Sequence, residues 1–346
     1  MIWEDMAMLS SIILHSYFGW LTVILCCRPN LRVCARMETF MEVRKDSRLP
    51  VEVSKQWGLD INIIPVKSKV WSVGSDYIVK ASENREDIER NIILMKELEK
   101  NNIPAAKPIK TADGKEYVAC NGLYYLMMSQ LSGVHITDIY QEDYANITAY
   151  TGRMIGRLHR ALLKCEQGTA FHANDFSSEI TGWVKNNLEE NGFAFCSRED
   201  FEDTCRELSL RYDRLGKQLI HRDLHYGNFL FQEGKFTGFI DFDLSKKDTK
   251  IFDICYFLVG LLVGHEDKKE DVSKWYEIIA SFIKGYEEEN VLLKIEKDSI
   301  CCLMQSIELL FVAFFIKVGE QQLAQSSANL YHFLKRNEAE ICRVIR

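Results

Sequence analysis

The feature that most constrains this chain is a polar loop at residues 220–231, IHRDLHYGNFLF, followed closely by GFIDFD at 238–243. Asp223 and Asn228 lie five positions apart in the loop, and Asp241 comes directly after a strand-like segment. A turn through Glu233 and Gly234 would fold the intervening residues into a β-hairpin. The spacing therefore predicts that the loop and Asp241 meet in one site.

These residue types suit phosphoryl transfer from a nucleotide. That reaction needs metal ions between the phosphates, a carboxylate aimed at the attacking hydroxyl and cations over the phosphates. The loop matches the pattern H-R-D-L-x-x-x-N, in which the aspartate accepts the hydroxyl proton and the asparagine holds a metal. We therefore predict Asp223 as the catalytic residue and Asn228 and Asp241 as ligands of Mg²⁺. Any one of them alone would be read as an ordinary turn residue.

HRDLHYGN followed by GFIDFD resembles the H-x-D-x-H-x-x-N and I-D-[FW]-[DEG] signatures of the aminoglycoside phosphotransferase and choline kinase superfamily. The resemblance is strong over 220–256 and extends over about 61–286. It implies a protein-kinase-like fold that uses ATP and Mg²⁺ to phosphorylate a hydroxyl of a small molecule. It also implies that Asp253 ties down the catalytic loop. His221 and His225 are expected to support the loop rather than to act as acid or base.

The fold class expected is α+β, with two lobes as in protein kinases. Residues 37–131 alternate strand and helix signals and predict a small antiparallel sheet with one helix, at 85–101, that binds the nucleotide. Asn121-Gly122 predicts a tight hairpin within that sheet. Residues 132–346 are mainly helical, beginning with a long amphipathic pattern at 138–164, and contain the catalytic loop and the acceptor pocket.

Contacts to the nucleotide are predicted from the first lobe. Lys80, in YIVKAS, resembles the strand lysine that contacts the phosphates. Its carboxylate partner on the following helix is expected at Glu86 or Glu89, with Glu89 preferred, although the usual family interval before Pro104 falls near Asn91. The chain has no G-x-G-x-x-G, so the phosphate loop would be PVKSKVW, with Ser68 and backbone amides as donors. The adenine is expected against the segment from Met128 to Leu131.

The acceptor is expected to be a small molecule, because only eleven residues separate Asp241 from Asp253 and leave no room for a peptide-docking segment. Acidic and aromatic residues near 266–286 could attract a cationic group. Nucleic acid is not expected as a partner at a net charge of -7. Two alternatives remain: a protein-directed kinase similar to the spore-coat kinases, and a nucleotide-binding module without catalysis.

Residues 1–36 form a hydrophobic extension, in which residues 6–27 carry no formal charge and could cross a bilayer. The natural start could instead be Met37 or Met41, or the segment could be a packed accessory helix. Contact with a membrane is expected only if 6–27 are a true anchor. We expect a cytoplasmic protein, because most of the eleven cysteines lie in apolar runs and none forms C-x-x-C.

Overall fold

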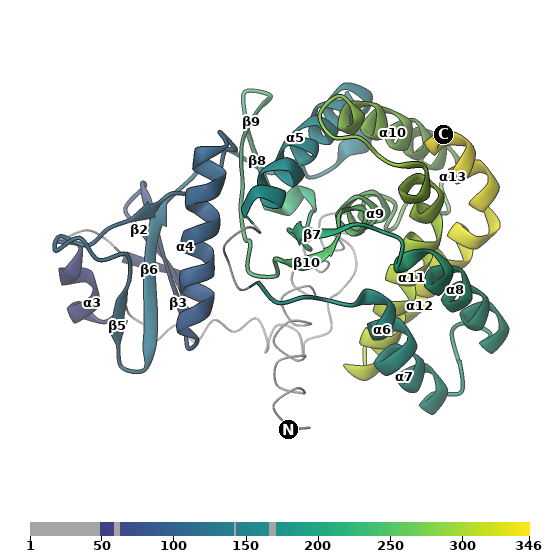
Figure 1. The fold of residues 1–346 in the computed structure, drawn as a ribbon, viewed down its shortest axis with the longest axis horizontal. Helices are drawn as coiled ribbons and strands as arrows, with labels where there is room; N and C mark the ends of the chain where they lie inside the picture. Colours follow the sequence, from purple (N-terminus) through teal and green to yellow (C-terminus); the bar gives the residue numbers. More distant parts are fainter. Residues whose placement is uncertain (1–48, 59–62, 142, 166–170) are drawn as a thin grey trace.

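The computed structural model describes residues 49–58, 63–141, 143–165 and 171–346. The predictions for residues 1–36, for an anchor at 6–27 and for a start at Met37 or Met41 lie outside the described residues. The boundary predicted at residue 131 falls two positions after the last strand of the first sheet. Figure 1 shows this sheet at one end of the molecule and the helical part at the other.

The first lobe is an antiparallel sheet in the order β1-β2-β3-β6-β4, with β5 paired to β6. Two tight turns explain its connections: Gly74 has φ 60°, and Asn121 and Gly122 both have positive φ, as a type I′ hairpin requires. The short helix α3 packs against this sheet through the buried Val53, together with the buried Trp57 directly after the helix. The elements are α3 Val51–Gln56, β1 Ile63–Lys67, β2 Val70–Val73, β3 Tyr77–Ser82, α4 Arg85–Lys100, β4 Pro108–Ile109, β5 Val118–Cys120 and β6 Leu123–Ser129.

Helix α4 lies between the sheet and the rest of the molecule (Figure 1). Asn84 caps its first turn by accepting a hydrogen bond from the backbone N–H of Glu86 at 3.0 Å. Its buried residues Ile88, Ile92 and Met95 pack on Leu126 of β6. The helix thus presents its remaining faces to solvent and to the second lobe.

The second lobe is helical around two short hairpin-like sheets, in which β7 pairs β10 and β8 pairs β9. The predicted turn at Glu233-Gly234 joins β8 to β9, and both of its residues have positive φ. The strands are β7 Lys217–Ile220, β8 Phe229–Gln232, β9 Lys235–Phe239 and β10 Lys246–Thr249. The helices are η1 Ile139–Gln141, α5 Tyr144–Cys165, α6 Phe176–Glu179, η2 Ile180–Val184, α7 Lys185–Glu190, α8 Arg198–Tyr212, η3 Tyr226–Asn228, α9 Lys250–Gly260, α10 Lys269–Glu287, α11 Lys294–Lys317, α12 Gln321–Arg336 and α13 Glu338–Ile345.

The long helix predicted at 138–164 begins later, at Tyr144. Asp138 accepts a hydrogen bond from the backbone N–H of Tyr140, and this contact starts the separate turn η1. Helix α5 then crosses α10 so closely that a Cβ at Gly285 would lie 2.0 Å from the carbonyl oxygen of Ala149. This close packing fixes α5, which supports the catalytic loop.

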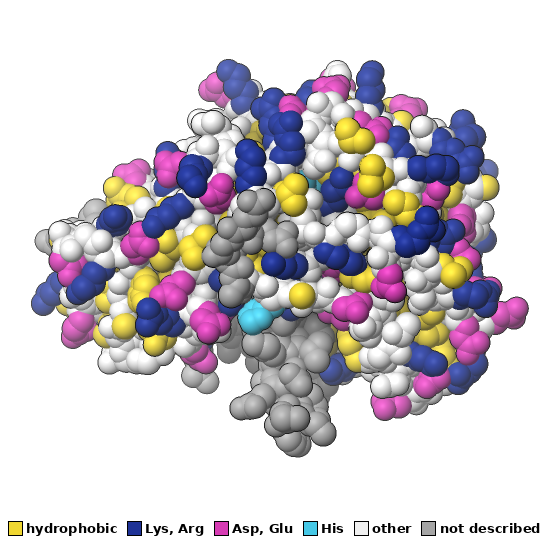
Figure 2. Space-filling model, in the orientation of Figure 1, with side chains coloured by type: hydrophobic (Ala, Val, Ile, Leu, Met, Phe, Trp, Pro, Cys, Tyr) yellow, Lys and Arg dark blue, Asp and Glu magenta, His cyan; other side chains and the backbone are white. Residues whose placement is uncertain are grey.

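Helix α11 is the one helix of the described residues that is long and apolar enough to cross a membrane, with a mean hydropathy of 2.1. Its most apolar stretch is 94% buried inside the fold, as in the core helix of a globular protein. On the face drawn in Figure 2, acidic and basic side chains are intermingled.

Candidate active site

The carboxylate predicted to be catalytic is held from two sides. Asp223 is buried, and its Oδ1 accepts a hydrogen bond of 2.9 Å from the hydroxyl of Tyr256 on α9. Its Oδ2 accepts from the side-chain amide of Asn228 at 3.1 Å. Burial and the neighbouring Asp223 raise the pKa of Tyr256 well above its ordinary value, so this hydroxyl remains a donor. The carboxylate therefore has a fixed orientation.

Asn228 and His225 shape the turn that follows Asp223. The Nδ2 of Asn228 donates to the backbone oxygen of Asp223 at 2.8 Å as well as to its carboxylate, so the Oδ1 of Asn228 is directed elsewhere. The Nδ1 of His225 accepts from the backbone N–H of Gly227 at 3.0 Å and caps η3. This leaves the proton on Nε2, which lies 3.8 Å from the carboxylate of Asp223. His225 thus contacts the backbone of this turn, and its role in supporting the loop stays a prediction.

Asp253 fastens the start of the loop to α9. Its carboxylate accepts from the backbone N–H groups of His221, at 2.9 Å, and Arg222, at 2.7 Å. It is fully buried and also lies 3.1 Å from Nε2 of His159 on α5, whose Nδ1 lies 2.8 Å from the hydroxyl of Tyr286. Three helices, α5, α9 and α10, therefore fix the loop through one carboxylate.

The side chains of His221 and Arg222 both bind neighbouring segments and so hold the loop in place. Burial lowers the pKa of His221, so the ring is neutral, and its Nε2 lies 3.1 Å from the carbonyl oxygen of Ile240, beside Asp241. Arg222 has φ 69° and binds both oxygens of Glu179 on α6, at 2.9 and 2.7 Å. A positive φ is costly for a side chain of this size, so the surrounding contacts must impose it.

Asp241 stands two residues beyond β9, with φ 60°. The ammonium of Lys80 on β3 lies 3.3 Å from its Oδ1 and also forms an ion pair with Asp243. Burial disfavours the charge on Lys80, but Asp241 and Asp243 outweigh it and hold the pKa of the lysine above its ordinary value. The lysine and the predicted metal ligand therefore share one site.

The expected pairing of Lys80 with Glu89 is wrong. Glu89 accepts hydrogen bonds from Arg85, at 2.8 Å, and from the hydroxyl of Tyr117, at 3.2 Å. The side chain of α4 that reaches the site is Asn91, whose Nδ2 donates to Oδ1 of Asp243 at 3.2 Å. Two positions along a helix correspond to a rotation of about 200°, so Glu89 and Asn91 point in nearly opposite directions.

The other predicted nucleotide contacts lie at the edge of this site. Ser68 is exposed in the turn between β1 and β2, beside Lys69 with φ 57°. Met128 lies on β6 opposite Ile78 of β3. Leu131 follows β6, and its Cδ1 would lie 2.5 Å from a Cβ at Gly238 of β9, so glycine there leaves room for this side chain. Their contacts with a nucleotide stay predictions.

The chemistry of the donors fits Mg²⁺. Oxygen ligands from one or two side chains, completed by water and substrate phosphates, are the usual environment of this ion. Asp241 and Asn228 would provide such oxygens. Among the described residues there is no cluster of three or more histidine, cysteine or acidic side chains that could hold a metal by itself. The pair thus suits a metal that arrives with a nucleotide.

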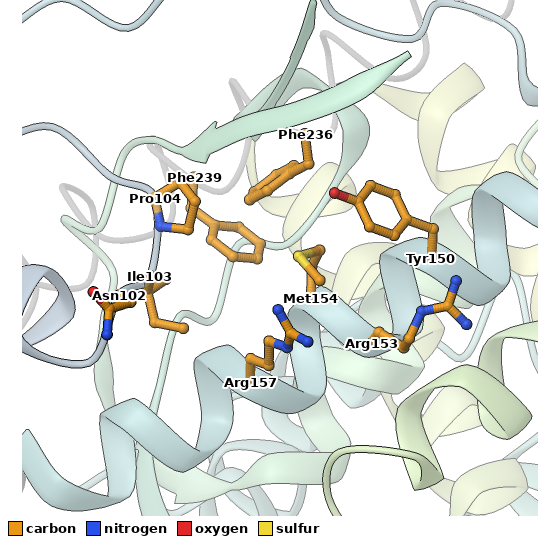
Figure 3. A pocket seen from close by; sticks show the side chains of 9 residues that line it. All are labelled: Asn102, Ile103, Pro104, Tyr150, Arg153, Met154, Arg157, Phe236 and Phe239. Atoms are coloured by element: carbon orange, nitrogen blue, oxygen red, sulfur yellow. The ribbon is translucent and has the colours of Figure 1, made fainter.

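A cavity of about 230 Å³ lies apart from these residues. Figure 3 shows Tyr150, Met154 and Arg157 of α5 facing Phe236 and Phe239 of β9 across it. None of the predicted site residues lines this cavity. We therefore assign the chemistry to the loop and not to the cavity.

Sequence comparisons identify a family and relatives of this chain. The model of the phosphotransferase enzyme family matches residues 66–277. Amicoumacin kinase of Bacillus subtilis (strain 168) is 29% identical over 202 residues, which cover 55% of this chain and 57% of that protein. Homoserine kinase of Zymomonas mobilis is 25% identical over 249 residues, 68% of this chain and 72% of that protein. The aligned part of amicoumacin kinase is thus little more than half of its length.

Solved structures share the fold. An amicoumacin kinase in complex with AMP-PNP, Ca²⁺ and its ligand superposes with a TM-score of 0.58 at 22% identity, over 89% of this chain and 94% of that one. An aminoglycoside phosphotransferase from Alicyclobacillus acidocaldarius gives 0.64 at 12% identity, over 86% and 96%. The two-lobed α+β fold expected from the sequence is confirmed. The family model covers more than half of the chain, over both lobes and the catalytic loop, and so this chain belongs to the phosphotransferase enzyme family.

Proposed function

We propose that this protein transfers the γ-phosphoryl group of ATP, with Mg²⁺, to a hydroxyl group of a small molecule. The observation that carries the proposal is the buried Asp223, oriented by Tyr256 and Asn228. Asp223 would accept the proton of the acceptor hydroxyl. Asn228 and Asp241 would hold Mg²⁺, which neutralises charge on the phosphates, and Lys80 would bind those phosphates.

The path from Asp241 to α9 supports a small acceptor. Residues 246–249 form β10, which pairs with β7 directly before the catalytic loop, and α9 begins at Lys250. Protein kinases place a longer segment here to dock a peptide. A paired strand leaves no such segment, which disfavours the protein-directed alternative.

Two buried carboxylates near the catalytic residue support a cationic acceptor. Glu308 of α11 is fully buried with Ser327 beside it, and its charge would reach Tyr256. Glu266, 8% exposed, lies close enough to raise the pKa of Glu308 further. Burial keeps a proton on Glu308 in the free protein, and an ammonium group on the acceptor would favour its ionised form. One solved relative is named an aminopropanol kinase.

Two of the aromatic residues in the region 266–286, Trp275 and Tyr286, have other partners. The indole N–H of Trp275 donates to the carbonyl oxygen of Leu258, and Tyr286 lies beside His159. Both side chains are fully buried in the core. The cation would therefore be recognised by carboxylates rather than by these rings.

We expect Glu308→Gln to stabilise the protein at pH 8 by about 1–3 kcal/mol and to leave its stability at pH 5 nearly unchanged. Burial, the largest effect, raises the pKa of Glu308 well above 4.5. The folded state therefore keeps a proton that the unfolded state loses, and stability falls as pH rises above about 4.5. Glutamine removes this loss. Urea unfolding at both pH values measures the effect, with the exposed Glu270→Gln as control. Equal pH dependence of parent and Glu308→Gln would contradict the assignment.

The proposed function is tested by a coupled ADP-release screen against amines, amino alcohols, sugars and aminoglycosides. We expect ADP release that depends on one class of acceptor and stops when EDTA removes divalent metal. Labelled protein in extract supplied with labelled ATP, without release on any small acceptor, would favour the protein-directed kinase. No ATP turnover under any condition would identify a binding module and refute the proposal.

A further inference from the structure

The phosphate-binding lysine has an unusual set of partners. Both carboxylates that contact Lys80 come from the segment after β9, at Asp241 and Asp243, which lie 161 and 163 positions away in the sequence. The side chains of Lys80 and Asp243 are 20% and 19% exposed. This ion pair is therefore largely shielded from solvent and joins the two lobes.

Helix α4 contributes an amide to this group. Asn91 donates to Oδ1 of Asp243, while Lys80 contacts Oδ2. The acidic residues near the start of α4 have other partners: Glu86 and Asp87 pair with Arg90, and Glu89 pairs with Arg85. Among the described residues, no carboxylate of α4 forms an ion pair with Lys80.

We propose that Asp243 is the positioning residue for Lys80, in the place that a helix carboxylate takes in protein kinases, where the pair must form for activity. Asn91 would hold Asp243 and so connect α4 to the lysine through a neutral hydrogen bond. The inference rests on the proposed function. The two aspartates would then divide the work: Asp241 binds the metal, and Asp243 keeps Lys80 directed at the phosphates.

Asp243→Asn is expected to lower kcat/KM for ATP by about 10- to 100-fold, because the lysine loses its fixed direction. Affinity for MgADP, measured by calorimetry, should fall with it, whereas the Mg²⁺ concentration for half-maximal ATP turnover should stay near that of the parent. Asp241→Asn should instead raise that Mg²⁺ concentration. The control is Glu86→Gln, which removes an exposed charge from α4, the helix that carries Asn91. It should change neither kcat/KM for ATP nor the Mg²⁺ requirement.

A rescue separates positioning from a general structural role. In the Asp243→Asn background, Asn91→Glu returns a carboxylate to the site from α4 and should recover at least about a third of the lost kcat/KM, at an unchanged melting temperature. Two results would overturn the inference and leave the proposed function standing. One is a kcat/KM of Asp243→Asn within twofold of the parent, and the other is a shift in its Mg²⁺ requirement equal to that of Asp241→Asn. A parent protein that binds no MgADP and turns over no ATP would overturn both.

Discussion

Asp223→Asn is expected to lower kcat by about 10²- to 10⁴-fold, the usual contribution of a positioned general base. The amide of asparagine cannot accept the proton of the attacking hydroxyl. It still offers Tyr256 an oxygen acceptor, so the loop should stay folded. Nucleotide binding, which we propose to depend on Lys80, Asn228 and Asp241, should be nearly unchanged. Single-turnover kinetics and calorimetry with MgADP measure the two effects separately.

The matched control is Asp213→Asn, the same change from carboxylate to amide at an exposed position shortly before β7, the strand that leads into the loop. This variant should turn over at the parent rate. Thermal unfolding of all three proteins tests whether the variant is folded. An Asp223→Asn enzyme that retains the parent kcat would show that another group accepts the proton.

Asp253→Ala is expected to reduce the free energy of unfolding by about 3–5 kcal/mol, the range found when one partner of a buried polar network is removed. The backbone N–H groups of His221 and Arg222 and the ring of His159 would lose their common partner. Buried donors without partners are costly, and the loop would be free to move away from Asp223. Activity should therefore fall together with stability.

Urea unfolding measures this loss. The control is Asp267→Ala, at an exposed position in the segment after α9, the helix that carries Asp253, and its free energy of unfolding should stay within about 0.5 kcal/mol of the parent. If Asp253→Ala loses less than about 1 kcal/mol, the carboxylate does not hold the loop as the hydrogen bonds indicate.

Much of the fold followed from local signals. Asn121-Gly122 and Glu233-Gly234 predicted two hairpins because few other residues accept the positive φ of such turns. The hairpin at Glu233-Gly234 in turn placed Asp241 at the catalytic loop, since the distance along the chain was set by two short strands. Local geometry was sufficient wherever the partner residues were near in sequence.

The partner of Lys80 could not be found in this way. It comes from the other lobe, and only the packing of the two lobes brings Asp243 to the lysine. The error at Glu89 has a simpler cause. Asn91 lies beside the apolar stripe formed by Ile88, Ile92 and Met95, and helical spacing along that stripe would have pointed to position 91 rather than 89. The residue type at position 91 argued against it, since a carboxylate was expected.

Two further residues of the site were missed. Tyr256 lies three positions after Asp253 on α9, so both face the loop, and this spacing was visible in the sequence. Glu179 carried no such signal, because α6 is only four residues long and reaches Arg222 through the fold of the second lobe.

The contact between Arg222 and Glu179 has a consequence for control of the enzyme. In kinases switched by their activation segment, an added phosphate attracts an arginine and orders that segment. Here a carboxylate of the chain itself, Glu179, already binds the guanidinium through both of its oxygens, and the residues before α9 are already paired as a strand. An added phosphate is therefore not needed to order this described segment or to engage Arg222.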